Sequence, residues 1–293
     1  MDFNTAEELI KLCESGLSIA DAMRKRETVL GETDADTVEE KMKKALDIMR
    51  DSAHKPIETH FPTTGGLIGG EASKLNAHAM SGKSICGTVL TRALIYSQAV
   101  PEVNASMGVI VAAPTAGSSG VVPAVLFALE DEFGLDEKTL LDGLFTAGAV
   151  GYLLMKNASV SGAQAGCQAE IGSSSAMAAA MATAMMGGTP EQCFDAASIA
   201  LSNLLGLVCD PIAGLVEAPC QSRNAIGAAN AITCAEMALS SIKAVVPFTE
   251  MMQAMYRVGC KLPSELRETA LGGCAATPTG CAHNCRIFGG CNN

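Results

Sequence analysis

Three cysteines between residues 160 and 220 constrain this chain more than any other feature. Cys167 ends the segment Ser-Gly-Ala-Gln-Ala-Gly-Cys, Cys209 begins Cys-Asp-Pro, and Cys220 ends Glu-Ala-Pro-Cys. Each has glycine or proline close by, residues that allow sharp turns and close approach of the backbone to a bulky ligand. Their long intervals exclude a compact Cys-x-x-Cys knuckle. They suit an iron–sulfur cluster held by three thiols from helix ends and loops, which would leave one iron open for chemistry.

The segments around these cysteines are predicted to be helical. The alanine- and methionine-rich run after Gly172 predicts a buried helix, and Thr189-Pro-Glu-Gln is a typical helix start. Only residues 107–113 leave a choice between a short strand and a buried helical segment. We therefore predict an all-α or nearly all-α fold, organised as one catalytic domain over residues 1–293.

The first 54 residues are predicted to form an amphipathic helical arm. Capping boxes at Thr5–Glu8 and Thr37–Glu40 mark helix starts, and the last helix of the arm is expected to end near Ala53. Glycine and cysteine dominate the C-terminal end of the chain. The expected division is an arm over 1–54, a cluster-binding core over 55–270 and a Gly/Cys-rich tail over 271–293.

Composition limits which residues can fill the core and which classes of partner the chain can bind. Hydrophobic residues make up 48% of the chain but aromatics only 4%, so small aliphatic residues and methionine must fill the core. A net charge of −11 argues against nucleic-acid binding through a basic face. The N-terminal sequence lacks a secretory signal, and the longest apolar run is too short to span a membrane. We expect a soluble cytoplasmic protein with no nucleic-acid or membrane partner.

Two loops have the character of ligand-binding loops. The glycines of residues 65–70 can present backbone amides to an anion. Ser118 and Ser119 precede an apolar helix, where hydroxyls and free amides suit a carboxylate, although a capped helix start without a ligand is an equal alternative. Lys83 is either a cation near that carboxylate or an exposed lysine at a helix start. The P-loop pattern is incomplete around Lys83, so nucleotide binding is not expected.

Seven of the other cysteines divide into two groups, while Cys260 and Cys274 belong to no recognisable motif. One group lies in apolar helical patterns and is expected to be small core residues: Cys13, Cys86, Cys193 and Cys234. The other group lies in the tail and consists of Cys281, Cys285 and Cys291. With His283 it is compatible with a zinc site, or with a flexible tail whose thiols reach the main cluster.

The chain resembles the alpha chain of the iron–sulfur-dependent bacterial L-serine dehydratases (L-serine ammonia-lyases) of the two-subunit type. The resemblance spans nearly the whole chain and rests on these segments: Gly65-Gly-Leu-Ile-Gly-Gly-Glu, Ser81-Gly-Lys-Ser, Asn104-Ala-Ser-Met-Gly, Ala113-Pro-Thr-Ala-Gly-Ser-Ser-Gly-Val-Val-Pro, residues 157–172, Gly206 to Cys220, Leu266-Arg-Glu-Thr and Ala276-Thr-Pro-Thr-Gly. The family's cluster ligands fall on Cys167, Cys209 and Cys220.

The resemblance implies a function. The family converts L-serine to pyruvate and ammonia with a [4Fe-4S] cluster, and the general base is expected from a beta chain, which makes the enzyme a heteromer and possibly a further dimer. Alternatives are an L-cysteine desulfidase on the same scaffold, a non-catalytic iron–sulfur subunit and a pyridoxal enzyme. Serine's carboxylate is assigned to Ser118 and Ser119, with Lys83 beside it. Cys291 could cap the fourth iron in the resting state.

Overall fold

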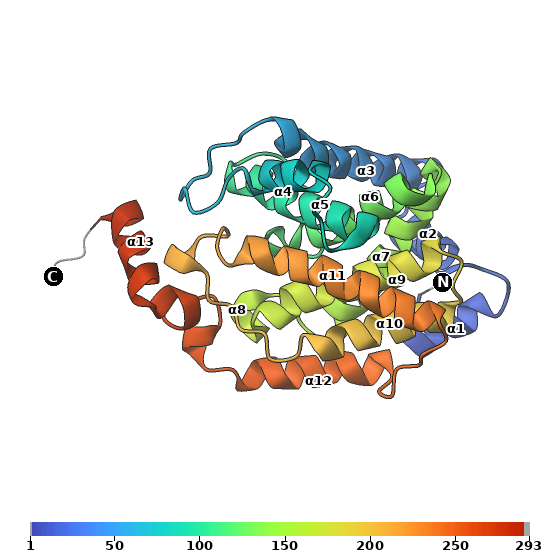
Figure 1. The fold of residues 1–293 in the computed structure, drawn as a ribbon. Coiled ribbons are helices and arrows are strands. Elements are labelled where there is room, and N and C mark those ends of the chain that lie inside the picture. Colours follow the sequence, from blue (N-terminus) through green and yellow to red (C-terminus); the bar gives the residue numbers. More distant parts are fainter. Residues whose placement is uncertain (1, 290–293) are drawn as a thin grey trace.

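The structure is a computed structural model that describes residues 2–289, and this part of the chain contains helices but no strand. The prediction of an all-α fold is confirmed (Figure 1). The α-helices are α1 (Ala6–Cys13), α2 (Ile19–Leu30), α3 (Ala35–Glu58), α4 (Glu71–Met80), α5 (Gly87–Ala105), α6 (Val121–Phe133), α7 (Glu137–Asn157), α8 (Gly162–Ala165), α9 (Ser173–Met185), α10 (Pro190–Asn203), α11 (Cys220–Leu239), α12 (Phe248–Lys261) and α13 (Pro278–Phe288).

Helix α9 is the centre of the molecule. It is buried almost completely and packs against α6, α7, α10 and α11. A helix that is apolar on all sides is typical of a protein core, because no face has to meet water. The alanine- and methionine-rich sequence is therefore the buried helix that was predicted. A short helix of π type, η2 (Gln168–Gly172), runs directly into α9.

Glycines of α7 make room for the methionines of α9. A Cβ on Gly143 would lie 2.7 Å from Met185 Sδ, and one on Gly151 would lie 3.0 Å from Met177 Cε. Both glycines lie on the same side of α7, eight residues apart, so the two helices can approach closely and the flexible thioethers fill the gaps. This packing explains how a core with few aromatic residues closes.

The N-terminal helices belong to the common core. Leu9, Ile19 and Leu46 are buried in the same hydrophobic cluster as α9, and α2 packs on α7 while α3 packs on α5. Helix α3 is also longer than predicted, because it begins after the N-cap Asp34 and continues through Pro56 to Glu58. Asp34 accepts hydrogen bonds from both the amide and the hydroxyl of Thr37, so Thr37 does not cap the helix.

Shortening the Leu46 side chain tests whether α3 shares the common hydrophobic core. Its side chain is 2% exposed, so Leu46→Ala leaves a cavity and is expected to lower the free energy of unfolding by about 2–5 kcal/mol. Urea denaturation measures the loss. Val29→Ala serves as the control, since Val29 is 56% exposed on α2. An unfolding curve for Leu46→Ala that matches the control would mean that α3 does not share the core.

Two segments differ from the predictions. Residues 107–113 form neither strand nor helix, because no neighbouring strand is present among residues 2–289 to pair with them. The region after residue 271 is helical where a flexible tail was an option. Thr277 caps α13 by accepting the Gly280 amide, and Pro278 occupies the first helical position.

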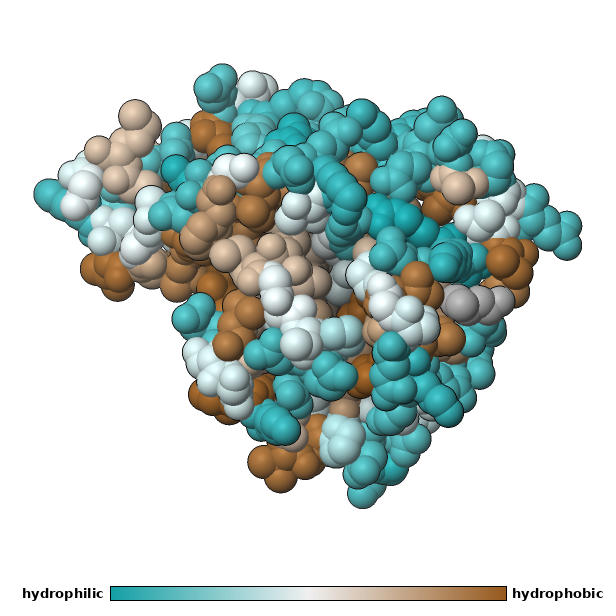
Figure 2. All heavy atoms as spheres, turned by 90° about the vertical axis from the view of Figure 1, so that its right-hand side faces the viewer, coloured by the Kyte–Doolittle hydropathy of each residue, from teal (hydrophilic) through white to brown (hydrophobic). Residues whose placement is uncertain are grey.

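The two ends of the molecule are formed by different parts of the chain. In Figure 1, α13 lies at one end beside the loops that follow α10, and the N-terminal helices lie at the other. Figure 2 shows the N-terminal end, where hydrophilic residues cover most of the surface around a patch of hydrophobic ones. Within the described residues no helix has the length and apolar character that a membrane span requires.

Candidate iron–sulfur site

Cys167, Cys209 and Cys220 are positioned by three different elements. Cys167 immediately precedes η2, Cys209 lies in the loop after α10, and Cys220 is the first residue of α11. Their exposed fractions are 3%, 3% and 8%, respectively. The expectation that helix ends and loops would carry these thiols is confirmed, and all three are buried.

The three thiols are electrostatic neighbours. Burial raises the pKa of Cys167 and of Cys220 to about 12, and it raises the pKa of Cys209 further still. The charges of Glu170 and of the other cysteines add to the effect at Cys209. Such thiols stay protonated unless a positive centre binds them, because ligation requires the thiolate. The raised pKa values therefore argue against a free nucleophilic cysteine in this site.

Arg223 supplies the positive charge of the site. It lies one turn into α11, donates a hydrogen bond to Val208 O at 2.8 Å and forms an ion pair with Asp210 at 2.7 Å. Its guanidinium also lies beside the thiols of Cys167 and Cys220 and partly offsets the rise in their pKa. Arginine in this position balances the negative charge that thiolate ligands bring.

The Cys209 segment is clamped by the chain that follows α12. The Cys209 amide donates to Leu266 O at 2.9 Å, and its carbonyl accepts from the Glu268 amide at 2.7 Å. Asp210 extends the clamp by accepting the Cys274 amide at 2.6 Å. Burial alone would raise the pKa of Asp210, but the Cys274 amide and Arg223 outweigh it and hold that pKa below its usual value.

Glu170 is a charged group of the site that sequence reasoning missed. Its carboxylate accepts from Thr115 Oγ1 at 2.7 Å and contacts Cys209 Sγ at 3.7 Å. Burial is the main reason that the pKa of Glu170 is raised. The signal was present, because Glu170 is an acidic residue only three positions after Cys167.

The residues present fit an iron–sulfur cluster. Thiolates are the usual ligands of such clusters, and small residues leave room around these ones: a Cβ on Gly162 would approach Cys209 Sγ to 3.0 Å. Within residues 2–289 no group of three His, Cys, Asp or Glu side chains could hold a single metal ion. The zinc alternative also involves Cys291, which lies outside the described residues, so it stays an alternative. A cluster spreads its ligands over several irons and does not need them to converge on one point.

The predicted substrate residues are not brought together. Ser118 and Ser119 are fully buried, and their hydroxyls bond locally: Ser119 donates to Ala116 O at 2.8 Å, and Ser118 contacts Thr115 Oγ1 at 3.1 Å. Lys83 is exposed in the turn after α4 and forms no ion pair within the described chain. Their assignment to serine binding stays a prediction.

The remaining cysteines mostly match expectation. Cys193 and Cys234 are buried core residues, and Cys13 is half-buried. Cys86 is also half-buried, but it lies in the turn before α5 and not within a helix. In the tail, α13 carries Cys281, Cys285 and His283. Cys291 lies outside the described residues, so its proposed cap on the cluster stays a prediction.

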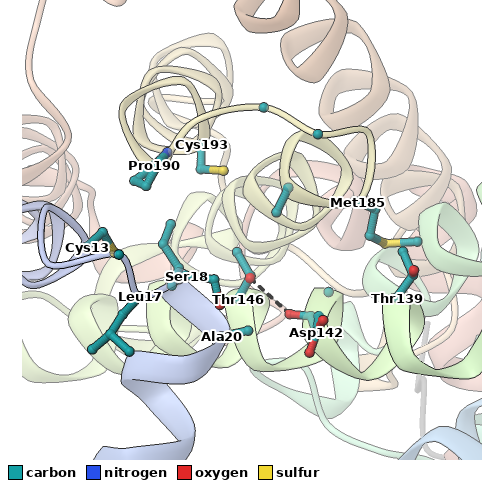
Figure 3. Close-up of a pocket in the computed structure, with 16 residues that line it drawn as sticks. Cys13, Leu17, Ser18, Ala20, Thr139, Asp142, Thr146, Met185, Pro190 and Cys193 are labelled. Atoms are coloured by element: carbon teal, nitrogen blue, oxygen red, sulfur yellow. Dashed lines mark hydrogen bonds between the residues drawn. The ribbon is translucent and has the colours of Figure 1, made fainter.

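A separate cavity lies away from the three cysteines. About 500 Å³ of space lies between the turn from α1 to α2, the first half of α7 and the start of α10 (Figure 3). Cys13 and Cys193 line it, together with Asp142 and Thr146. Met185 also lines it. This residue is the last of α9, whereas Cys167 precedes the first turn of that helix, so the cavity is separate from the three cysteines.

The fold and the site together define a class of protein: an all-helical chain that holds three buried thiols, an arginine and a glutamate around one centre. The family model for the serine dehydratase alpha chain matches residues 14–275, and the chain belongs to this family. It is 47% identical to the probable L-serine dehydratase alpha chain of Bacillus subtilis over 98% of this chain and 96% of that protein. It is 46% identical to the L-serine dehydratase alpha chain of Peptoniphilus asaccharolyticus, over 94% and 95% of the two chains.

A third relative is matched over only part of its length. The chain is 38% identical to the L-serine dehydratase TdcG of Escherichia coli over 94% of this chain, but the match covers only 62% of that protein. The rest of that relative lies outside the matched region.

Proposed function

We propose that this chain is the catalytic alpha chain of an iron–sulfur L-serine dehydratase, which converts L-serine to pyruvate and ammonia. The observation that carries the proposal is the buried set of Cys167, Cys209 and Cys220, in a chain 47% identical over almost its full length to a probable L-serine dehydratase alpha chain. These cysteines hold the [4Fe-4S] cluster.

The residues of the site suit this elimination. Serine must lose its α-proton and its hydroxyl group, and hydroxide is a poor leaving group. When bound, the cluster supplies a Lewis-acidic iron for that hydroxyl. Arg223 balances the charge of the thiolates, and Glu170 provides a carboxylate beside Cys209. Burial of the three cysteines keeps bulk water away from them.

A beta chain completes the proposed enzyme. The names of the Bacillus and Peptoniphilus relatives as alpha chains imply a partner, and the longer Escherichia relative fits a fused arrangement. We propose that the partner provides the general base and that the heteromer is cytoplasmic and takes part in amino-acid degradation. Further dimerisation of the heteromer is part of the same proposal.

Anaerobic reconstitution tests the function. The alpha chain alone is expected to bind iron and sulfide and to show the visible absorption of a cluster, yet to release little or no pyruvate from L-serine. Adding the beta chain is expected to start pyruvate release. L-cysteine is the comparison substrate: preferential pyruvate and sulfide release from it would replace serine by cysteine in the proposal. A reconstituted pair that binds no iron, or that binds iron and uses neither substrate, would contradict the proposal.

A further inference from the structure

Residues 63–70, here named the glycine strap, enclose a carboxylate of the protein itself. Glu217 is 2% exposed, and its carboxylate accepts the Gly65 amide at 2.6 Å and the Leu67 amide at 2.8 Å. Thr63 Oγ1 lies 3.4 Å from the same group. The glycines of residues 65–70 were predicted to present backbone amides to an anion. The amides of Gly65 and Leu67 already bind Glu217, a carboxylate of the same chain.

The fit between the strap and Glu217 leaves no spare room. A Cβ on Gly65 would lie 2.5 Å from Leu215 Cδ1 and 3.1 Å from both carboxylate oxygens of Glu217. A methyl group at position 65 would therefore have to displace the Leu215 side chain and press against the Glu217 carboxylate. Hydrogen bonds from amides to a buried carboxylate are among the stronger ones in proteins, so this contact holds the strap firmly.

A second buried carboxylate anchors the chain just after the strap. Glu102 of α5 is fully buried and accepts the Ala72 amide at 3.0 Å. Gln221 lies 3.4 Å from the same oxygen, and it also donates to Gln98 O at 3.1 Å. Glu217 and Gln221 flank Cys220, so both anchors of the strap are tied to the segment that carries this cysteine.

The amides of Gly66 and Ile68, in the middle of the strap, remain open. Gly66 and Ile68 alternate with the amides that bind Glu217, and neither has a hydrogen-bond partner for its amide among residues 2–289. Gly66 is also exposed. The hydroxyls of Ser118 and Ser119, by contrast, bond within their own turn. The strap therefore offers a carboxylate what the two serines do not: unpaired amide donors, on a loop that Glu217 holds against the segment before Cys220.

We propose that Glu217 is a positioning residue, which holds the glycine strap against the Cys220 segment so that the open amides of Gly66 and Ile68 receive the carboxylate of the amino-acid substrate. The inference rests on the proposed function and refines it. Glu217 does not touch the substrate in this arrangement; it acts through the strap.

Two changes disturb the contact from opposite sides. Glu217→Ala removes the acceptor, and Gly65→Ala places a methyl group against it. In the reconstituted pair of chains each is expected to raise KM for L-serine about tenfold or more, with kcat much less affected, because ground-state binding is what is lost. Iron and sulfide content should stay at the wild-type level. The Kd from the change in the cluster's visible spectrum on titration with L-serine should rise in parallel.

Glu217→Gln keeps one acceptor oxygen and the shape of the side chain, so a smaller rise in KM is expected. If the alanine variants prove too unstable to purify, Glu217→Gln alone tests the inference. The controls are Glu250→Ala, an exposed glutamate on α12, and Gly148→Ala, a glycine of α7 with space around it.

Unchanged KM and Kd in the Glu217 and Gly65 variants would overturn the inference and leave the proposed function intact. A loss of iron in proportion to activity would also overturn it, by showing that Glu217 only supports the cysteine segment. No turnover by the wild-type pair would instead overturn the proposed function, and the inference with it.

Discussion

Replacing Cys209 by serine is expected to abolish both cluster binding and pyruvate formation. Cys209 is 3% exposed and lies beside Cys167, Cys220 and Glu170. A serine hydroxyl is a much poorer ligand for iron than a thiolate, and no spare thiol among residues 2–289 is buried at this place. Cys167→Ser and Cys220→Ser should behave in the same way, because a site with three ligands tolerates the loss of none.

Iron and sulfide analysis of the anaerobically purified variants provides the measurement. Cys260→Ser is the matched control, because Cys260 is exposed on α12 and a serine there meets solvent. The control should keep full iron content and activity. A Cys209→Ser protein with normal iron content and turnover would remove Cys209 from the ligand set.

Arg223→Gln is expected to cause the second largest loss. Its guanidinium pairs with Asp210, whose side chain is 2% exposed, and removing it leaves the buried carboxylate with the Cys274 amide but no positive charge beside it. Breaking a buried pair in this way typically costs about 3–5 kcal/mol of stability. The thiolates of Cys167 and Cys220 also lose their nearest positive charge, so the cluster should become more labile.

A double variant separates the two effects. Arg223→Gln with Asp210→Asn removes the unpaired carboxylate, so thermal or urea denaturation should show most of the stability restored. The faster loss of cluster absorption should persist, since the positive charge is still missing. If the double variant held its cluster as long as the wild-type protein does, Arg223 would have no electrostatic role beyond its pair with Asp210.

The helical fold and the placement of the three cysteines at helix ends and loops could be predicted from sequence, because their signals are local. The composition of α9 and the Thr189-Pro start of α10 each depend on a few adjacent residues. The start of α3 was misassigned because Asp34 and Thr37 both look like caps, and only the hydrogen-bond geometry decides between them. In the same way, glycine and cysteine after residue 271 obscured the Thr277-Pro278 helix start.

The missed features depend on contacts between distant segments. Glu170 meets Thr115, and Glu217 meets Gly65, across more than 50 and 150 positions of the chain, respectively. The pattern of apolar and polar residues along the sequence does not indicate such pairs. The glycine-rich sequence correctly indicated an anion-binding loop, but its anion is a glutamate of the same chain, which only the fold can reveal.

The clamp on Cys209 has a consequence for biosynthesis. Residues 264–274, which cover Cys209 and Asp210, are translated after all three cysteines. While a nascent chain ends before Leu266, the Cys209 amide and carbonyl lack the partners that hold them in the folded protein. The surroundings of Cys209 are therefore completed only after the segment that follows α12 has been synthesised.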